Sequence, residues 1–427
     1  MPRADRIWVS MSPAARTAAA ALLLAIATLP VLSRQFLGRT GAEIPIFMHG
    51  VDALLQGRLY GEHVFEYPPY ALIWFLAPYA WSPADVASFR FAFGLEIWFF
   101  DAAIKAVLLW RAIRGRNGFP DLIPFFVYSL GSAALGHLLL MKYDAIPAAL
   151  SLAGVLAVTG GWPGLGGTAM MLAAGTKAYP ALFIPILAVV AWRRSPAELR
   201  RFAAGVVTAA APLALLALWM PWWTFAAFHG VRGLEVGSLA ASLVWALHFT
   251  GVDASWALIG TSNEVGGPLA AFLLWPARLL WVVSTLACLG MAVAAAVRTA
   301  RETVSTPASV ASLMLLAVVA FVATNTVFSP QFHLWLVPLA ALALEGRRAD
   351  LPRPAVRGAW VIFFATVVVP TFYPSREYAL GLGLWRTAVL VFRNLLLLYA
   401  AVCLWNAARE MSEQRHRLGA GLAKLPA

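Results

Sequence analysis

Long apolar runs recur along the whole chain, and no other feature of the sequence restricts its fold as strongly. A transmembrane helix needs about 20 mostly apolar residues, because the hydrocarbon core offers no water to bond the backbone N–H and C=O groups. Only 12% of the 427 residues are charged, whereas a soluble globular chain carries roughly 25%. The sequence therefore predicts an all-α, polytopic membrane protein with one integral membrane domain, residues 1–427.

The apolar runs and the breaks between them predict about twelve transmembrane helices. The run 70–81 is too short to cross a bilayer and is expected to form a re-entrant or interfacial helix. A second such stretch, SLAASLVWALH, is amphipathic and follows the seventh span. The expected spans are residues 17–33, 86–111, 120–137, 144–160, 162–176, 178–192, 202–220, 270–297, 307–325, 333–345, 358–372 and 386–407.

Basic residues in the short loops predict the orientation, because cytoplasmic loops carry an excess of Lys and Arg. Arg3, Arg6 and Arg16 precede the first span, which we expect to stay uncleaved, and RRSPAELRR and the tail are also basic. We expect a multi-pass plasma-membrane protein with a cytoplasmic N-terminus, 1–16, and a basic cytoplasmic tail, 408–427. Residues 34–85 would form the first extracytoplasmic loop, and 221–269 a second long outer segment.

The composition also restricts the partners. The net charge of +12 is explained by these topology signals and by contacts to anionic membrane lipids, so no nucleic acid is expected. The two cysteines, Cys288 and Cys403, fall in apolar runs and have no metal-ligand spacing. No Walker P-loop, Rossmann glycine pattern or HExxH is present. No cofactor and no metal site is therefore predicted, although a divalent metal stays open.

The first outer loop, GAEIPIFMHGVDALLQGRLYGEHVFEYPP, is expected to carry the chemistry. Glu43 is the first candidate for a general base that deprotonates an acceptor hydroxyl, and Asp52 is the reserve. For both carboxylates, a solvated surface charge is the alternative. Glu66 and the two prolines after Tyr67 are expected to fix the exit of the loop, with Tyr67 lining a pocket.

Further polar residues fall on the same outer face under this topology, and such residues usually pair or serve a site. Lys142 and Asp144 could form a local ion pair at a hairpin turn. Lys177 could snorkel to the interface or bind a phosphate. The set of candidate binding residues is Tyr67, Lys142, Asp144, Lys177, Arg232, Glu235, Gln331 and His333.

The last four of these candidates have alternatives of their own. Arg232 and Glu235 could pair within one helical turn, or Arg232 could grip a phosphate with its planar fork. Gln331 could bind a sugar hydroxyl. His333 is expected as an interfacial histidine, or as part of the same site.

The stretch AEIPIFMHGVDALLQGRLYGEHVFEYPPYALIWFLAPYA resembles the first loop of the GT-C glycosyltransferases. The resemblance is to glycosyltransferase family 87, the polyprenyl-phosphate-mannose-dependent mannosyltransferase group. Four later stretches are similar to the same group, in the same order, and carry the resemblance from about residue 40 to 345. They are KYDAIPAALSLAGVLA, AAGTKAYPALFIPILAVVAWRR, RGLEVGSLAASLVWAL and TVFSPQFHLWLVPLA.

The resemblance implies a GT-C-like fold with its active site on the outer face. The donor would be a polyprenyl-phosphate hexose, with mannose as the first choice, and the acceptor a glycolipid or glycan, with inversion at the sugar. The base would be Glu43, where the family usually has aspartate, and Lys177 and Arg232 would contact the donor phosphate. Two other interpretations stay open: a polytopic transporter or lipid-linked sugar flippase, and a non-catalytic membrane scaffold.

Overall fold

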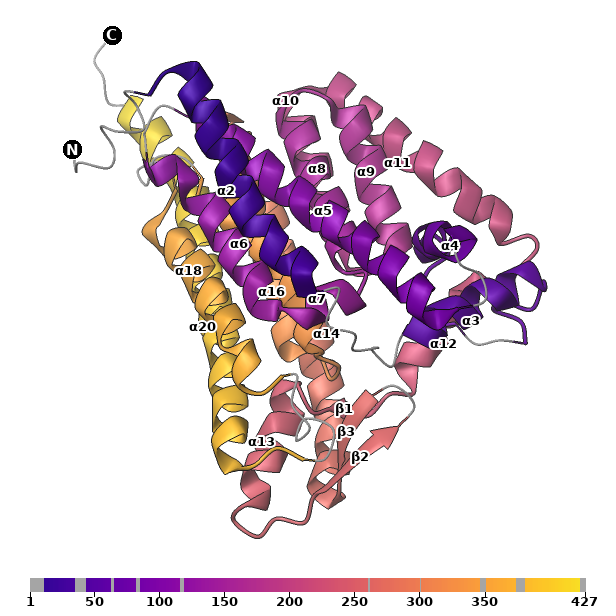
Figure 1. Ribbon diagram of the computed structural model, residues 1–427. Helices are drawn as coiled ribbons and strands as arrows, with labels where there is room; N and C mark the ends of the chain where they lie inside the picture. The colour runs from indigo at the N-terminus through magenta and orange to yellow at the C-terminus, as the bar shows by residue number, and fades with distance from the viewer. Residues whose placement is uncertain are drawn as a thin grey trace.

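The computed structural model consists of α-helices that run side by side, with a small three-stranded sheet at one end of the bundle (Figure 1). We call this the sheet end. The structure describes residues 11–34, 44–62, 65–81, 85–115, 119–259, 262–299, 301–345, 351–373 and 381–422. The start of α2 (Pro13–Ser33) and the end of α20 (Leu384–Leu422) both lie at the opposite end of the bundle (Figure 1).

Within these described ranges, six helices are long and apolar enough to cross a membrane, so the protein is membrane-embedded. They are α2, α11 (Pro196–Leu216), α14 (Pro268–Arg298), α16 (Pro307–Thr324), α18 (Arg353–Val367), which continues into the turn η6 (Val369–Thr371), and α20.

The other predicted spans are also helices, but each is either shorter or more charged than these six. Span 86–111 is α5 (Val86–Arg114), span 120–137 is η2 (Phe119–Leu122) with α6 (Ile123–Leu135), and span 178–192 is η3 (Tyr179–Phe183) with α10 (Ile184–Arg194). The remaining three are α8 (Ala145–Thr159), α9 (Pro163–Thr176) and α17 (His333–Ala343).

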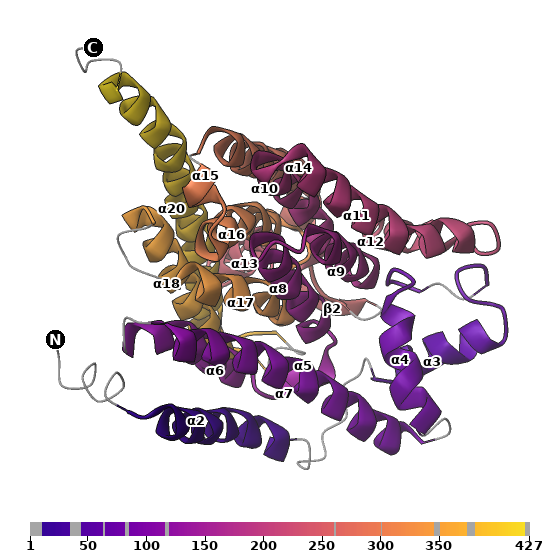
Figure 2. The same cartoon turned by 90° about the horizontal axis from the view of Figure 1, so that it is seen from above.

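Short elements complete the chain, and two of them match the predicted interfacial helices: α4 (Ala71–Trp81) and α13 (Leu239–His248). In both views α3 and α4 project at one side of the bundle, away from α20 (Figures 1 and 2). The others are α3 (Ile44–Leu55), α7 (His137–Met141), η4 (Trp222–Thr224), α12 (Phe225–Gly230), α15 (Arg301–Val304) and η5 (Pro330–Phe332).

Local sequence signals explain where several helices begin. The side chains of Asp85, Ser195, Ser238 and Thr306 accept hydrogen bonds from backbone N–H groups in the first turns of α5, α11, α13 and α16. These bonds satisfy donors that have no partner inside the helix. Proline follows Ser195 and Thr306 directly, at a position where its missing N–H costs nothing.

The core forms around α16, which is buried along almost its whole length and packs against α14, α17 and α20. The outer helices show the opposite pattern. On α14, Phe272 and Trp275 are each 72% exposed, and similar exposure occurs on α2 and α11. A helix that is apolar all round is typical of a bundle centre, whereas large exposed apolar side chains on a membrane protein face lipid.

The structure adds a small sheet to the predicted all-α fold, and this sheet lies in segment 221–269, which is predicted to be extracytoplasmic. Strands β1 (Leu234–Glu235), β2 (Ser255–Ile259) and β3 (Ser262–Gly266) pair antiparallel in the order β1-β3-β2. The alternative in which Arg232 and Glu235 pair within one helical turn is therefore wrong, because Glu235 lies in β1 and pairs with Glu264 across the sheet.

Candidate functional site

A buried ion pair joins the beginning of one helix to the end of the next. Asp144 stands directly before α8 and Lys177 directly after α9, and the two helices pack as an antiparallel hairpin. Lys177 Nζ lies 2.6 Å from Asp144 Oδ1, and the aspartate is fully buried. Lys177 lies 33 residues from Asp144 in the sequence, and this ion pair is additional to the predicted local pair of Lys142 with Asp144, which stays a prediction.

A third helix contributes a hydrogen bond to the same oxygen. The indole Nε1 of Trp335, near the start of α17, donates to Asp144 Oδ1 over 2.6 Å. The other oxygen, Oδ2, is buried and has no hydrogen-bond partner among the described residues. A buried acceptor left without a donor costs free energy, so this oxygen is available to a polar ligand.

Aromatic rings surround the ammonium group of Lys177. It lies 4.7 Å from the ring centroid of Tyr143, 5.2 Å from that of Trp335 and 5.7 Å from that of Phe332. Trp335 in turn stacks between Phe332, at 3.9 Å, and Tyr179, at 4.1 Å. These contacts hold a charge at the edge of an apolar bundle at tolerable cost, since ring faces attract cations.

The exit of the first loop packs against this pair. Tyr67 meets Tyr143 edge to face, with ring centroids 5.0 Å apart, and its backbone carbonyl accepts a hydrogen bond from the Tyr60 hydroxyl. Burial raises the pKa of Tyr67 well above its usual value, and the neighbouring charge of Glu66 raises it further. Tyr67 thus packs beside the ion pair and stays protonated at neutral pH, while its role in lining a binding pocket stays a prediction.

Glu66 is a site residue that sequence reasoning missed, because its place before Tyr67 and two prolines indicated only a loop exit. Its side chain is 8% exposed. Its charge acts on both Tyr67 and Tyr143, and its backbone carbonyl bonds His229 Nε2 at 3.0 Å. In the sequence, a site role for Glu66 is indicated only by its residue type, a carboxylate next to Tyr67, which is itself predicted to line a pocket.

A third carboxylate lies on the sheet. Glu235 on β1 is 4% exposed and accepts a hydrogen bond from the Ser329 hydroxyl. Burial raises the pKa of Glu235, whereas Arg232, the Ser329 hydroxyl and Lys142 lower it. Arg232 and Glu235 therefore act on each other across a bend and a strand rather than along a helix.

Lys142 is influenced both by the Asp144–Lys177 pair and by Arg232 and Glu235 near the sheet. Burial lowers its pKa to about 7; Asp144 and Glu235 act in the opposite direction, while Lys177 and Arg232 lower it further. An ammonium that responds to all four charges lies among them. We call this set the sheet-end cluster; its members are Glu66, Tyr67, Lys142, Tyr143, Asp144, Lys177, Arg232 and Glu235.

Gln331 and His333 lie next to the cluster, but the histidine points elsewhere. Its Nδ1 is 2.9 Å from the Thr366 hydroxyl and its Nε2 is 3.4 Å from Arg393, which donates to the carbonyl of Gly237. Gln331 is 8% exposed and lies in η5, which in the sequence stands between Ser329, the partner of Glu235, and Trp335, the partner of Asp144. The site assignment of Gln331 stays a prediction, whereas His333 helps to hold α18 and α20 together.

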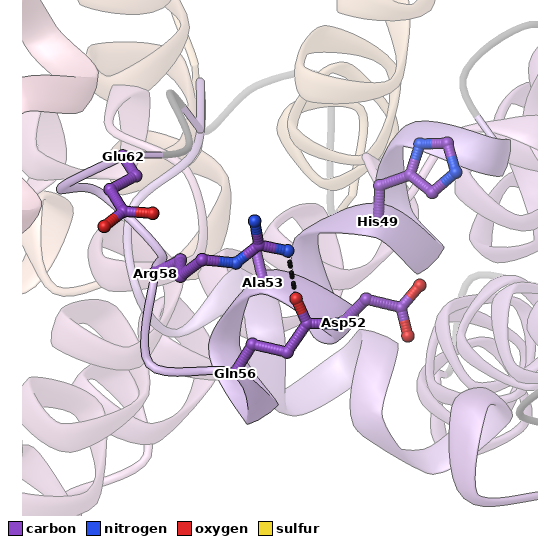
Figure 3. Close-up of a pocket in the computed structure, with 6 residues that line it drawn as sticks. All are labelled: His49, Asp52, Ala53, Gln56, Arg58 and Glu62. Atoms are coloured by element: carbon purple, nitrogen blue, oxygen red, sulfur yellow. Dashed lines mark hydrogen bonds between the residues drawn. The ribbon is translucent and has the colours of Figure 1, made fainter.

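Of the two carboxylates proposed as bases, only Asp52 is described by the structure, and it lies apart from the sheet-end cluster. Glu43 lies outside the described residues. Asp52 lies on the face of α3 that carries His49 and Gln56, where it accepts a hydrogen bond from the Tyr79 hydroxyl and lines a separate pocket (Figure 3).

The cluster combines three cations with three carboxylates at the end of an apolar bundle, an arrangement that can bind a phosphate and also accept a proton. Among the described residues, no group of three His, Cys, Asp or Glu side chains is placed to hold a metal ion. Neither the scan against protein-family models nor the search of curated proteins finds a match for this chain.

Proposed function

We propose that this protein is a membrane glycosyltransferase. It would move a hexose, with mannose as the first candidate, from a polyprenyl-phosphate sugar to a glycan or glycolipid on the extracytoplasmic face. The observation that carries the proposal is the sheet-end cluster, in which Lys142, Lys177 and Arg232 are gathered with Glu66, Asp144 and Glu235 at one end of a membrane-embedded bundle.

The proposed orientation puts the sheet end outside. The opposite ends of α5, α10 and α14 carry Arg111, Arg114, Arg193, Arg194 and Arg298. Such clusters favour the cytoplasmic side. The termini would then be cytoplasmic, and about twelve crossings in a GT-C-like arrangement in the plasma membrane would carry the chain between the faces.

The chemistry needs a cationic site beside lipid, because the donor carries a phosphodiester on a polyprenyl tail. Lys177 and Arg232 would hold that phosphate. The acceptor oxygen would attack the anomeric carbon and give its proton to a carboxylate. The bond from that carbon to the phosphate oxygen would break, and its electron pair would leave on the polyprenyl phosphate. Cations near the phosphate would stabilise the growing negative charge.

The base in this scheme is Glu43, with Glu66 as a second candidate inside the cluster. The test is sugar transfer from radiolabelled polyprenyl-phosphate-mannose in proteoliposomes, with Glu43→Gln, Glu66→Gln and Lys177→Met compared with Glu413→Gln, an exposed control on α20. We expect one glutamine variant to lose about 10²–10⁴-fold, the usual contribution of general base catalysis. Full activity in Glu43→Gln would remove that residue as the base, and no transfer by the wild type would refute the proposal.

A transporter or flippase is the second candidate, and one observation favours it. Asp101 and Lys105 form an ion pair inside α5 with both side chains fully buried, and ionisable groups at such depth often mark a transport path. Uptake of a lipid-linked sugar into proteoliposomes without formation of a glycosidic bond would support this alternative over transfer.

A further inference from the structure

Helix α3 has two faces with different surroundings. On one face, Phe47 stacks on Phe75 with ring centroids 4.4 Å apart and meets Tyr67 and Tyr143 edge to face, each at 5.9 Å. On the other, His49, Asp52 and Gln56 follow at intervals of three and four residues, which places them on one side of a helix. Helix α3 therefore separates the sheet-end cluster from a second polar surface.

That second surface is hollowed into a pocket of about 390 Å³, which we call the α3 pocket. Gly57, with φ 68°, ends α3 in a left-handed conformation that glycine adopts without strain, and the backbone N–H of Arg58 then bonds the carbonyl of Ala53. The turn brings Arg58 and Glu62 back over the end of the helix. The pocket lining is His49, Asp52, Ala53, Gln56, Arg58 and Glu62 (Figure 3).

The polar groups of the pocket are held by hydrogen bonds. Arg58 donates to the side-chain carbonyl of Gln56, and Figure 3 shows this pair between Glu62 on one side and His49 and Asp52 on the other. The Tyr79 hydroxyl donates to Asp52 Oδ1. The pocket therefore presents two carboxylates, an amide, an imidazole and a guanidinium in one space, with donors and acceptors mixed.

The charge balance excludes most classes of ligand. In the part of the lining that the structure describes, Asp52 and Glu62 outnumber the one permanent cation, Arg58, so an anion such as a phosphate is disfavoured. Among the described residues, those of the α3 pocket included, no three His, Cys, Asp or Glu side chains are placed to hold a metal ion. Among the described residues of the lining, Ala53 is the only apolar side chain, so an apolar ligand would leave the polar groups unpaired.

We propose that the α3 pocket binds a neutral saccharide. Adjacent hydroxyls of a sugar each donate and accept one hydrogen bond, which matches a lining of carboxylate, amide and guanidinium groups. In the reaction proposed above, on which this last step rests, the pocket holds the non-reacting part of the glycan acceptor. The packing of Phe47 against Tyr67 and Tyr143 fixes its position relative to the sheet-end cluster.

The test measures binding and transfer separately on the full-length protein in nanodiscs. Saturation-transfer NMR with an α-linked mannotriose follows binding to the wild type, to Gln56→Ala and Arg58→Ala, and to the control Glu413→Gln. Gln56 and Arg58 are exposed, so both variants are expected to fold. Each should raise the apparent Kd by about threefold to tenfold, the effect of losing one or two hydrogen bonds, and the control should not change it.

The transfer assay gives the second readout. Loss of contacts to a non-reacting part of the acceptor should raise the acceptor KM by the same factor, with kcat and the donor KM unchanged. No mannotriose binding by the wild type, or equal binding by the pocket variants, would overturn the proposal. Binding that is lost in the variants of a protein with no transferase activity would support the saccharide site and refute the glycosyltransferase function instead.

Discussion

Two buried ion pairs in this protein have the same charges and opposite settings. Lys105 lies 2.5 Å from Asp101 on the same helix, both side chains are fully buried, and Lys105 also donates to the carbonyl of Ala27 on α2. Lys177 and Asp144 are 33 residues apart, and the lysine side chain is 15% exposed. Both aspartates leave one oxygen without a partner among the described residues, so that feature does not distinguish the pairs.

What distinguishes the pairs is the surroundings. The Asp101–Lys105 pair connects two neighbouring helices, α2 and α5, and is closed to solvent. The Asp144–Lys177 pair has aromatic rings around it, and its charges act on Lys142 together with those of Arg232 and Glu235. Removing one partner of a closed pair leaves the other charge buried and alone, whereas a partly exposed pair among further charges is where a ligand can compete for a contact.

We call Asp101–Lys105 the closed pair and Asp144–Lys177 the open pair. The largest expected effect is a loss of unfolding free energy when the closed pair is broken. Lys105→Met should lower the free energy of unfolding by about 3–5 kcal/mol, because it leaves Asp101 charged and buried without its partner. Thermal unfolding in nanodiscs measures the loss. The double variant Asp101→Leu, Lys105→Met should recover most of it, and a double variant no more stable than the single one would contradict the comparison.

The second prediction concerns activity and the open pair. Lys177→Met should lower the transfer rate by about 10²–10³-fold, the usual loss when one group that stabilises developing charge is removed. Its effect on unfolding should be smaller than that of Lys105→Met, because Asp144 keeps the Trp335 hydrogen bond. Kinetics and thermal unfolding on the same preparations separate the two effects. A rate loss in Lys105→Met equal to that in Lys177→Met would erase the distinction.

The third prediction isolates the hydrogen bond from Trp335. Trp335→Phe keeps a ring that can stack on Tyr179 and Phe332 but removes the N–H that donates to Asp144. We expect a loss of about 1.5–3 kcal/mol in unfolding free energy, the range for a hydrogen bond to a charged group. Phe332→Leu is the matched control, because it removes only a stacking partner. Equal losses in both variants would show that the ring, rather than the N–H, matters.

The helices could be predicted from the sequence because each depends on its own residues. The apolar run of residues 307–325, for example, is α16 to within one residue, since Thr306 and Pro307 mark its beginning. The sheet could not, because β1 has only two residues and gains its hydrogen bonds from β3, about 30 positions later. A strand that short has no periodicity of its own to detect.

The same distinction applies to the site. That Asp144 and Lys177 share one face followed from the order of the spans, but their pairing depends on how α8 packs on α9. Distance along the sequence could suggest only the local pair of Lys142 with Asp144, which stays a prediction. The sequence around Glu66 predicts only a loop exit. Its position near Tyr143 depends on how the loop folds, which the sequence does not indicate.

The smallest expected effect is a pH dependence that distinguishes Lys142 from its neighbours. Its pKa is about 7 in the folded protein against 10.5 for the free side chain. Between these values the unfolded chain binds more protons, so this lysine makes folding more favourable as pH rises. Lys142→Met should therefore unfold at a higher temperature than the wild type at pH 6, with the difference disappearing towards pH 10.

The expected difference is no more than about 1 kcal/mol, less than the full pKa difference would give, because Lys142 is partly exposed and solvent screens its ammonium group. Thermal unfolding of wild type, Lys142→Met and Glu413→Gln across that pH range measures it, and the control should follow the wild type. An unchanged pH slope in Lys142→Met would mean that this ammonium is as well solvated as a surface lysine. Lys142 would then be fully protonated at neutral pH, and the open pair would differ from the closed pair in α5 by its solvent exposure and its aromatic surroundings.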